Sequence, residues 1–255
     1  MSSENQGTGF SLSGLNILIL GAKLGIGASL ASICANQNAN IILADKEEPL
    51  ELADNLRQKS PANVSAYACD ISDREAVDAL AAKLCKMNCA PHSVAITAGV
   101  TFYNDWIDAD NNTWQRDVEQ IFNVNLSGPI NIARSFLPIM EKNRWGRMVL
   151  VGSIAGRMGG LTSQPHYAAS KGGVHSLTRW LASKYAPSGV LVNAVAPGPT
   201  KTRMTEGRSI DTSKLPLKRM LDPEDIAWPI AFLLSPAAAG MVGVVLDVNG
   251  GATFS

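Results

Sequence analysis

Short runs of apolar residues alternate with amphipathic segments along this chain. The runs are continuous, which is typical of strands that are buried on both faces of a sheet. They lie at Asn16–Leu20, Asn40–Ala44, Val64–Ala68, Ser93–Thr97, Arg147–Val151, Val190–Ala196 and Val244–Val248. Apolar residues recur at helical spacing in the segments between them, at Ile26–Ala35, Glu48–Lys59, Asp73–Lys86, Thr113–Lys142, Tyr167–Tyr185 and Pro223–Leu234. Because proline removes a backbone hydrogen bond, Gly128 and Pro129 should kink or divide the longest of these helices.

The alternation of strand and helix predicts the fold class. This order is typical of a parallel sheet with helices on both faces, so we expect one α/β, doubly wound domain over residues 1–255 with a seven-stranded parallel sheet. The length of 255 residues would also allow two small domains, but no repeat, low-complexity segment or linker divides the chain. In such sheets ligands bind beyond the carboxyl ends of the strands, where all the motifs below fall.

Charge and composition narrow the function classes. Lys plus Arg and Asp plus Glu number 22 each, which argues against a nucleic-acid-binding protein, because that class needs a basic excess or stripe. No apolar run approaches the roughly 20 residues that span a bilayer, and residues 1–15 lack the order of a signal peptide. We therefore expect a cytoplasmic protein without a membrane segment. The four cysteines are expected to be reduced thiols, and no metal site is expected because no His neighbours Cys85 and Cys89.

A glycine-rich turn follows the first strand. Its residues are Gly21, Ala22, Lys23, Leu24, Gly25, Ile26 and Gly27. Glycines let a chain turn sharply and let a phosphate approach the backbone, and the N-terminus of the next helix offers N–H groups to a pyrophosphate. A glycine cluster can also be a plain tight turn, but strand before and helix after favour dinucleotide binding.

Two acidic residues end the next two strands. Asp45 lies about twenty residues beyond the glycine turn, where an acid accepts hydrogen bonds from the adenosine ribose. A carboxylate there repels a 2′-phosphate, so Asp45 favours NAD over NADP, although Lys23 is a contrary signal. Asp70 could accept from the adenine amino group, with Ile71 against the ring. The alternatives are a strand-end cap for Asp45 and an N-terminal helix cap for Asp70.

Tyr167 and Lys171 are four residues apart on an expected helix and therefore share a face. A neighbouring ammonium favours phenolate and lowers the pKa of a tyrosine from its usual value near 10. A pKa closer to neutrality suits proton transfer at a carbonyl oxygen. Taken alone, the pair would more often be an ordinary surface pair.

Two more polar residues point to the same place. Ser153 ends the fifth strand, so its hydroxyl should lie at the same sheet edge and bond a substrate oxygen. Asn125 lies in the long helix, where a buried amide needs partners, and a water bridging it to Lys171 would supply one. Asn125 could instead be a helix-bend residue. His166, beside Tyr167, faces another direction on a helix and is a weaker candidate for a catalytic group.

Taken together, these motifs make the chain resemble the short-chain dehydrogenase/reductase family over nearly its full length. The residues that carry the resemblance are the glycine turn, Asp70, Ala98, Gly99, Asn125, Ser153, Tyr167, Lys171, Pro197, Gly198, Gly250 and Gly251. The resemblance implies a Rossmann-type fold, a nicotinamide cofactor and a catalytic tetrad of Asn125, Ser153, Tyr167 and Lys171. In that family, the Tyr moves the proton, the Ser holds the carbonyl oxygen, the Lys binds the nicotinamide ribose, and the Asn supports a proton-relay water.

The resemblance also implies the remaining contacts. The cofactor would be bound by Gly21, Lys23, Leu24, Gly25, Ile26, Gly27, Asp45, Asp70, Ile71, Thr97, Ala98, Gly99, Tyr167, Lys171, Pro197, Gly198, Thr200 and Thr202. It implies a homotetramer, with the helices from Thr113 and Tyr167 packed against their mates and the C-terminal strand region forming another interface. Two positions depart from the family pattern: Leu20 stands for the usual Thr, and Ile96-Thr97 for the usual Asn-Asn. Since the first and fourth strands are neighbours in this fold, we expect one polar contact to be replaced by an apolar one.

A segment from Lys201 to Leu221, here called the lid, follows the sixth strand and should cover the substrate. Its apolar residues predict an uncharged or partly apolar carbonyl or secondary alcohol; they are Met204, Ile210, Leu215, Leu217 and Met220. The same residues could simply anchor the lid. The chain also resembles 3-oxoacyl-carrier-protein reductases through Asp247–Gly251. In such an enzyme Lys142, Arg144 and Arg147 could meet an acyl carrier protein, although a solvated helix end explains them as well.

The hypothesis is reversible hydride transfer between NAD(H) and a ketone or secondary alcohol, with Tyr167 as the proton-transfer residue. Reduction of a 3-oxoacyl thioester is an alternative with the same chemistry. A non-catalytic nucleotide-binding scaffold is an alternative from another class, against which the complete tetrad counts. Epimerisation or dehydration with tightly held NAD is a third.

Overall fold

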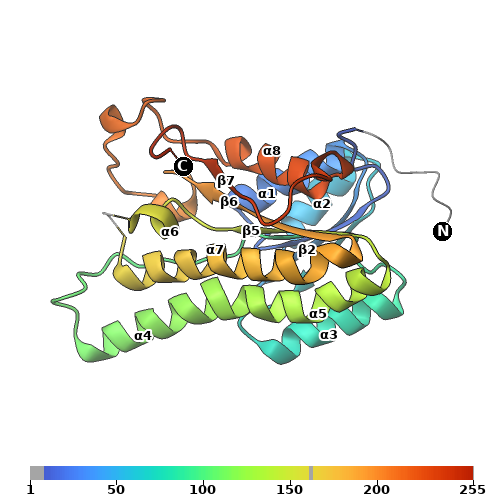
Figure 1. Ribbon diagram of the computed structural model, residues 1–255, viewed down its shortest axis with the longest axis horizontal. Helices are drawn as coiled ribbons and strands as arrows, with labels where there is room; N and C mark the ends of the chain where they lie inside the picture. The colour runs from blue at the N-terminus through green and yellow to red at the C-terminus, as the bar shows by residue number, and fades with distance from the viewer. Residues whose placement is uncertain (1–8, 161–162, 255) are drawn as a thin grey trace.

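A computed structural model describes residues 9–160 and 163–254. Within these residues, seven parallel strands form one sheet in the order β3-β2-β1-β4-β5-β6-β7 (Figure 1). The strands are β1 Asn16–Leu20, β2 Asn40–Asp45, β3 Val64–Ala68, β4 Ser93–Ile96, β5 Gly146–Val151, β6 Val190–Pro197 and β7 Val245–Val248. The expected fold class is confirmed. The strand order reverses between β1 and β4, and in such sheets that point opens the ligand crevice.

Helices cover both faces of the sheet (Figure 1). One face carries α1 Gly25–Asn36, α2 Leu50–Lys59 and α8 Pro223–Leu234. The other carries α3 Arg74–Lys86, α4 Asn111–Phe122, α5 Gly128–Lys142 and α7 Pro165–Tyr185. A short helix that the sequence pattern did not predict, α6 Ala155–Met158, follows β5. Among the described residues, no helix combines the length and the apolar character needed to cross a bilayer.

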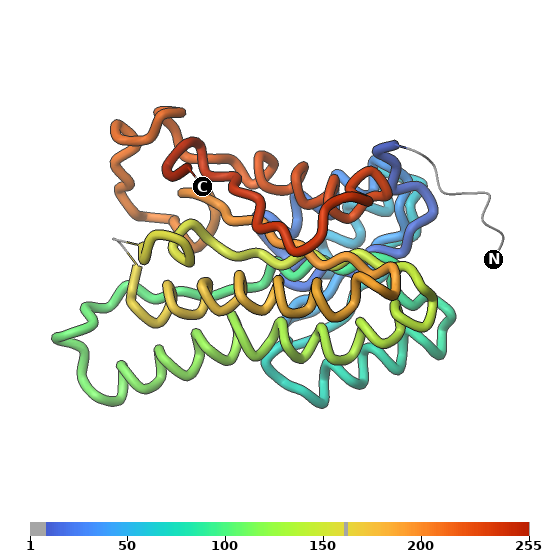
Figure 2. Tube along the Cα trace, in the orientation of Figure 1, coloured from blue at the N-terminus to red at the C-terminus, as the bar shows by residue number. Residues whose placement is uncertain are grey.

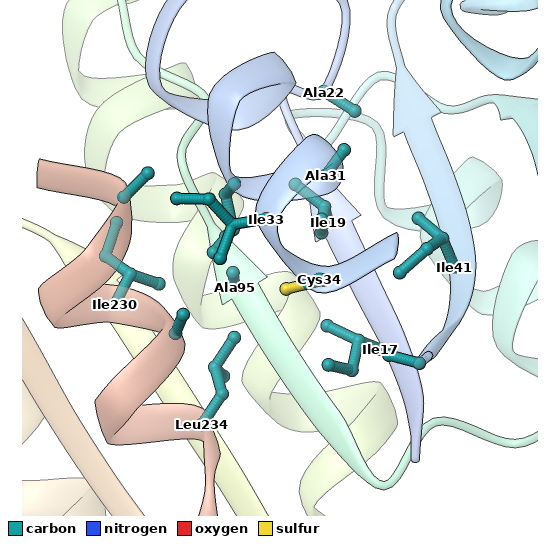
Figure 3. Close-up of a cluster of buried hydrophobic side chains, with 14 of the residues drawn as sticks. Ile17, Ile19, Ala22, Ala31, Ile33, Cys34, Ile41, Ala95, Ile230 and Leu234 are labelled. Carbon is teal, nitrogen blue, oxygen red and sulfur yellow. The ribbon is translucent and has the colours of Figure 1, made fainter. Parts of the chain in front are cut away.

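The core lies on both sides of the sheet. Along β1, Ile17 and Ile19 belong to one buried cluster, while Leu18 and Leu20 belong to the other. Figure 3 shows the first cluster, where side chains of β1, α1 and α8 meet. Every second residue of the strand therefore faces a different helix layer, which is why the strand has a continuous rather than an alternating apolar sequence.

The long helical segment is divided one turn earlier than Gly128 and Pro129 alone predict. A π-helix, Asn123–Ser127, separates α4 from α5. Such a wide turn holds an extra residue and is common at functional sites. Gly128 follows it directly, and a Cβ there would lie 2.6 Å from Ile71. The bend therefore brings α5 tightly against the segment that follows β3.

The loops at the carboxyl ends of the strands gather at one end of the molecule. Figure 2 shows the lid and the segment between β4 and α4 projecting at this end. The lid is tied at its base, because Thr200 and Leu221 form a parallel bridge. The backbone N–H of Leu221 donates to Pro199 over 2.8 Å, and that of Lys201 donates to Leu221 over 2.8 Å. The lid therefore starts and ends at the same point of the crevice.

Candidate active site

The glycine turn between β1 and α1 leaves no room for side chains. Gly21 has φ +82°, and a Cβ on it would lie 2.4 Å from the backbone nitrogen of Ala98. A Cβ on Gly27 would lie 2.1 Å from the carbonyl oxygen of Gly21. The N-cap residue of α1, Leu24, supplies no side-chain cap. The N–H groups of the first helical turn are therefore available to an anion, as a pyrophosphate requires.

Thr97 keeps a polar contact between β1 and the end of β4. Its hydroxyl donates to the carbonyl oxygens of Leu20, over 2.8 Å, and of Gly21, over 3.0 Å. The expectation that an apolar contact replaces a polar one here is therefore wrong. Leu20 points into the core and is fully buried, so its side chain cannot make the contact, and Thr97 bonds to the backbone of the glycine turn instead.

Asp45 lies at the end of β2 and faces the glycine turn. One carboxylate oxygen accepts from the backbone N–H of Lys23 over 2.9 Å, and the other accepts from that of Lys46 over 2.8 Å. The ammonium of Lys23 pairs with Glu47, and that of Lys46 lies 3.3 Å from Asp70. Both lysine charges near Asp45 are therefore matched by carboxylates.

Asp70 does not cap the helix that follows it. Its carboxylate accepts from the backbone N–H and the hydroxyl of Ser72, over 2.9 and 2.6 Å. The N-cap of α3 is Asp73, which accepts from two first-turn N–H groups. The hydrogen bonds from Ser72 and Lys46 hold the pKa of Asp70 below its usual value although burial opposes them. Ile71 is buried against Gly128, and its contact with an adenine ring stays a prediction.

Asn125 lies in the π-helix and is nearly inaccessible to solvent. Its side-chain oxygen accepts from the backbone N–H of Val100 over 2.8 Å, and its amide nitrogen donates to the carbonyl oxygen of Val100 over 2.9 Å. A Cβ on Gly99 would lie 3.4 Å from that side-chain oxygen and 3.3 Å from the Nζ of Lys171. The bend therefore places Asn125 and Lys171 on the same side of Gly99, and a water that bridges the two stays a prediction.

Lys171 and Tyr167 lie on one face of α7, under the carboxyl end of β5. The Nζ of Lys171 lies 5.8 Å from the centre of the Tyr167 ring. Burial lowers the pKa of Lys171 to about 8. Burial also raises the pKa of Tyr167 to about 12, against hydrogen bonding with Ser153, which lowers it. The expected lowering of the Tyr167 pKa is therefore wrong in this structure, because loss of solvation on burial is the largest effect on this phenol and raises its pKa.

Ser153 stands at the end of β5, above a buried histidine. Its hydroxyl accepts from the backbone N–H of Ala155 over 3.1 Å. Its own backbone N–H lies 3.5 Å from the Nε2 of His175, and a Cβ on Gly152 would lie 2.3 Å from the same atom. Burial is the main reason that the pKa of His175 is lowered to about 4. A neutral His175 therefore supports the backbone that carries Ser153.

The residues expected on the nicotinamide side follow β6. Gly198 packs against the segment after β7, where a Cβ would lie 2.6 Å from the carbonyl oxygen of Asn249. Thr202 crosses to the glycine turn, and its Cγ2 would lie 3.3 Å from a Cβ on Gly25. An open cavity of about 580 Å³ lies between the glycine turn and the lid. Its lining includes Leu24, Gly25, Thr202, Thr205 and Met220. Ile26 is the second residue of α1, Pro197 ends β6, and the hydroxyl of Thr200 donates to the carbonyl oxygen of Gly198 over 2.9 Å.

Two other candidates lie elsewhere. His166 is buried and packs edge-on against Trp114 of α4, with ring centres 5.1 Å apart. Arg147 is buried, stacks on Trp145 at 4.7 Å and donates to the carbonyl oxygen of Gly146. It therefore does not form a surface cluster with Lys142 and Arg144, because its side chain is used inside the fold.

A family model supplies the decisive comparison. The model for enoyl-(acyl carrier protein) reductases matches residues 21–253. The chain belongs to the short-chain dehydrogenase/reductase family. The matched range begins at the glycine turn and runs past β7, so it includes every element of the site described above.

Similar proteins include both sugar-alcohol and thioester enzymes. The chain is 36% identical to the galactitol 2-dehydrogenase (L-tagatose-forming) of Cereibacter sphaeroides, over 96% of this chain and 98% of that protein. It is 33% identical to a 3-oxoacyl-(acyl-carrier-protein) reductase of Vibrio harveyi, over 94% and 98%. A solved structure assigned as an NAD(P)-dependent gluconate 5-dehydrogenase of Beutenbergia cavernae, with NADP bound at low occupancy, matches with a TM-score of 0.88 and 31% identity, over 95% and 98%. Because that structure contains NADP, the similarity to it does not favour NAD over NADP as the cofactor.

This short-chain dehydrogenase/reductase holds site residues that the sequence analysis did not single out. His175 lies four residues after Lys171, so helical spacing places it on the same face as Tyr167 and Lys171. Arg157 of α6 forms an ion pair of 2.6 Å with Asp247 of β7. No local sequence signal predicts that pair, because it joins segments far apart in the chain.

Proposed function

We propose that the protein catalyses reversible hydride transfer between a nicotinamide dinucleotide and a ketone or secondary alcohol, with Tyr167 as the general acid and base. One observation carries the proposal. The buried amine of Lys171 lies 5.8 Å from the centre of the Tyr167 ring and donates to the carbonyl oxygen of Val151, two residues before Ser153, at the sheet edge where the glycine turn also ends. Membership of an oxidoreductase family supports the reaction type.

The residues at the crevice fit a dinucleotide. The glycine turn forms a cradle that a Cβ on Gly21 or Gly27 would fill, and the uncapped start of α1 suits a pyrophosphate. Thr202 and Gly198 line the opposite side, where the nicotinamide would lie. When bound, the cofactor supplies or accepts the hydride.

Each polar residue then has a definable task. With its pKa near 12, Tyr167 is protonated at neutral pH and can donate to the carbonyl oxygen during reduction. Ser153 bonds the same oxygen and orients the carbonyl. Lys171 has a pKa near 8, so it can exchange a proton close to neutrality, and Asn125 fixes the backbone of Val100 beside it.

We infer further that the enzyme prefers NAD to NADP. The two carboxylate oxygens of Asp45 each accept one backbone hydrogen bond and keep lone pairs for ribose hydroxyls. A 2′-phosphate would meet Asp45 and Glu47, while the Lys23 and Lys46 charges are already matched by Glu47 and Asp70. Titration of the protein fluorescence with NADH and NADPH tests this preference. Tighter binding of NADPH would contradict it.

The catalytic proposal is tested by one substitution and a matched control. Tyr167→Phe should lower turnover at least about 100-fold, because general acid catalysis contributes this much, while NADH binding stays within a few-fold. Tyr185→Phe removes the same hydroxyl from the last residue of the same helix and should leave turnover unchanged. The assay follows absorbance of both reduced cofactors with ketones, polyols and 3-oxoacyl thioesters. Equal activity of Tyr167→Phe and Tyr185→Phe would refute the assignment.

A second candidate function is the reduction of 3-oxoacyl thioesters. The similarity to the Vibrio harveyi reductase supports it. The burial of Arg147 counts against the cluster before β5 as a docking site for an acyl carrier protein. The thioester arm of the substrate panel separates the two candidates, because a thioester enzyme should reduce those substrates at least ten-fold faster than any free ketone.

A further inference from the structure

A stacked pair joins the lid to the segment that follows β4. The guanidinium carbon of Arg208 lies 3.4 Å from the centre of the Tyr103 ring. Arg208 belongs to the lid, and Tyr103 to the segment between β4 and α4, so the pair bridges two loops at the same end of the molecule (Figure 2). At this distance the flat guanidinium rests on the ring face, which is a favourable cation–π geometry.

The ring on which Arg208 rests belongs to a segment that is bonded to the helix of the catalytic tyrosine. The carbonyl oxygen of Asn104, the residue after Tyr103, accepts from the side-chain amide of Gln164 over 2.6 Å, and Gln164 is the N-cap residue of α7, three residues before Tyr167. The Tyr103 side chain is exposed; partial loss of solvation raises the pKa of its hydroxyl, and the charge of Arg208 opposes the rise. The stacked pair of Arg208 and Tyr103 therefore joins the lid to a segment that is bonded to the first turn of α7, the helix that carries Tyr167.

The guanidinium of Arg208 has no acidic partner within residues 9–160 and 163–254. No carboxylate in this part of the chain forms an ion pair with it. In contrast, the nearby lid residue Arg219 pairs with Asp225 at 2.6 Å. Stacking uses the face of a guanidinium and leaves its five N–H donors pointing outwards in the plane, in the fork that matches a carboxylate or phosphate.

The stack is not needed to hold the lid in place. The backbone bonds at Pro199, Lys201 and Leu221 close the base of the lid, and Lys201 and Arg219 pair with Asp222 and Asp225 beside it. The positive charge of Arg208, stacked on an aromatic ring, is therefore better explained by a role in binding a ligand than by a role in holding the lid.

We propose that Arg208, held on Tyr103, binds an acidic group of the substrate, so that the substrate is an oxyanion-bearing ketone or secondary alcohol. This inference rests on the proposed hydride transfer. It revises the expectation of an uncharged substrate, which followed from the apolar residues of the lid. The shared chemistry is a carboxylate or a phosphate that accepts a forked pair of hydrogen bonds.

The test uses pairs of compounds that differ in one group. 5-Keto-D-gluconate and L-sorbose differ by a carboxylate against a hydroxymethyl group, and dihydroxyacetone phosphate and dihydroxyacetone differ by a phosphate. Binding to the NAD⁺ complex, which cannot reduce a ketone, is measured by titration of the protein fluorescence, and turnover with NADH by absorbance. We expect the acidic member of one pair to bind about 10- to 100-fold more tightly, as the loss of a charge-assisted bond implies. The pair in which this happens identifies the oxyanion.

Variants assign that preference to the stacked pair. Arg208→Gln should abolish the preference by weakening the acidic compound alone, and Arg208→Lys should restore part of it, because lysine keeps the charge but loses the fork. Tyr103→Phe keeps the ring and should retain most of the preference, whereas Tyr103→Leu should lose it. Lys214→Gln removes one charge from the same lid, at the 3-10 turn Thr212–Lys214, and should change nothing.

Two outcomes would overturn the inference. One is equal binding of acidic and neutral members by the unaltered protein. The other is a preference that survives Arg208→Gln or is lost equally in Lys214→Gln. Because binding is measured without turnover, these outcomes differ from failure of the proposed function, which would appear as binding of cofactor and ketone with no hydride transfer.

Discussion

The side-chain nitrogen of Lys171 donates a hydrogen bond of 2.9 Å to the backbone oxygen of Val151. This bond fixes the amine of α7 to the end of β5, directly below Ser153. Lys171 is 4% exposed, and burial lowers its pKa to about 8. The protein therefore holds an ionisable amine where water cannot solvate it. The free-energy cost of burying its charged form should be measurable.

Replacing Lys171 with Met should abolish turnover and stabilise the fold. The pKa of Lys171 falls from 10.5 to about 8 on folding, so the unfolded chain binds the proton more tightly and the penalty is complete below pH 8. We expect Lys171→Met to raise the free energy of unfolding at pH 7 by about 2 kcal/mol, after loss of the bond to Val151. The gain should shrink between pH 8 and 10.5. Urea unfolding at pH 7 and pH 10.5 measures it, and a gain that is equal at both values would contradict this account.

Two glycines give opposite expectations for the same substitution. A Cβ on Gly27 would collide with Gly21 and Thr97, whereas a Cβ on Gly172 meets its nearest neighbour, the carbonyl oxygen of Gly156, at 3.6 Å. Gly27→Ala should therefore weaken NADH binding at least about ten-fold, because the cradle is displaced. Gly172→Ala should leave binding unchanged and stabilise α7 by about 1 kcal/mol, the usual difference between Ala and Gly in a helix. Cofactor titration and thermal unfolding of both variants check the pair.

Thr97 should matter through its hydroxyl alone. Thr97→Val keeps the shape but removes the hydroxyl that donates to the carbonyl oxygens of Leu20 and Gly21, although Leu20 still accepts from the backbone N–H groups of Thr97 and Ala98. We expect a loss of about 1 kcal/mol in stability and weaker NADH binding, since the bond holds the glycine turn. Thr97→Ser retains the hydroxyl and should restore binding. If Val and Ser variants bind NADH equally well, the hydroxyl has no role in the turn.

His175 should make the fold sensitive to acid. Its pKa falls from 6.5 to about 4 on folding, mainly through burial, with Arg157, Arg179 and Lys171 adding to the effect and Asp247 opposing it. The unfolded chain therefore gains a proton first, and stability is lost as pH falls from 6.5 to 4, by up to about 3 kcal/mol. His175→Gln removes the titration but keeps an acceptor for the N–H of Ser153. It should lose less stability than the unaltered protein between pH 7 and pH 4.5 in urea unfolding. Parallel losses in the two proteins would show that other groups cause the acid effect.

The fold was accessible from sequence because its signals are local and repeated. Continuous apolar runs such as Asn16–Leu20 mark strands with helices on both sides, and their alternation with amphipathic segments determines a parallel sheet. The π-helix at Asn123–Ser127 was not accessible, because apolar spacing does not distinguish one wide turn from a regular helix. The short helix α6 has only four residues, too few for a periodic pattern.

The sequence predicts which residues form the site, but it does not predict their pKa values. Four-residue spacing put Tyr167 beside Lys171, and the structure agrees. The sequence argument treated their charges without the burial that governs both pKa values, and so gave the wrong direction for Tyr167. The stack of Arg208 on Tyr103 joins two loops with no shared pattern, so only the folded chain reveals it.

The lid leaves and rejoins the fold at one bridge, between Thr200 and Leu221. A loop closed at its base tolerates changes in length and sequence, because doubling its length costs only about 0.6 kcal/mol in closure entropy. Residues 206–214 of the lid lie between Thr202, which contacts the glycine turn, and the buried Leu221, so mutations there spare both contacts. Descendants of this protein could therefore acquire new substrates by drift in that stretch while inheriting the proton-transfer machinery intact.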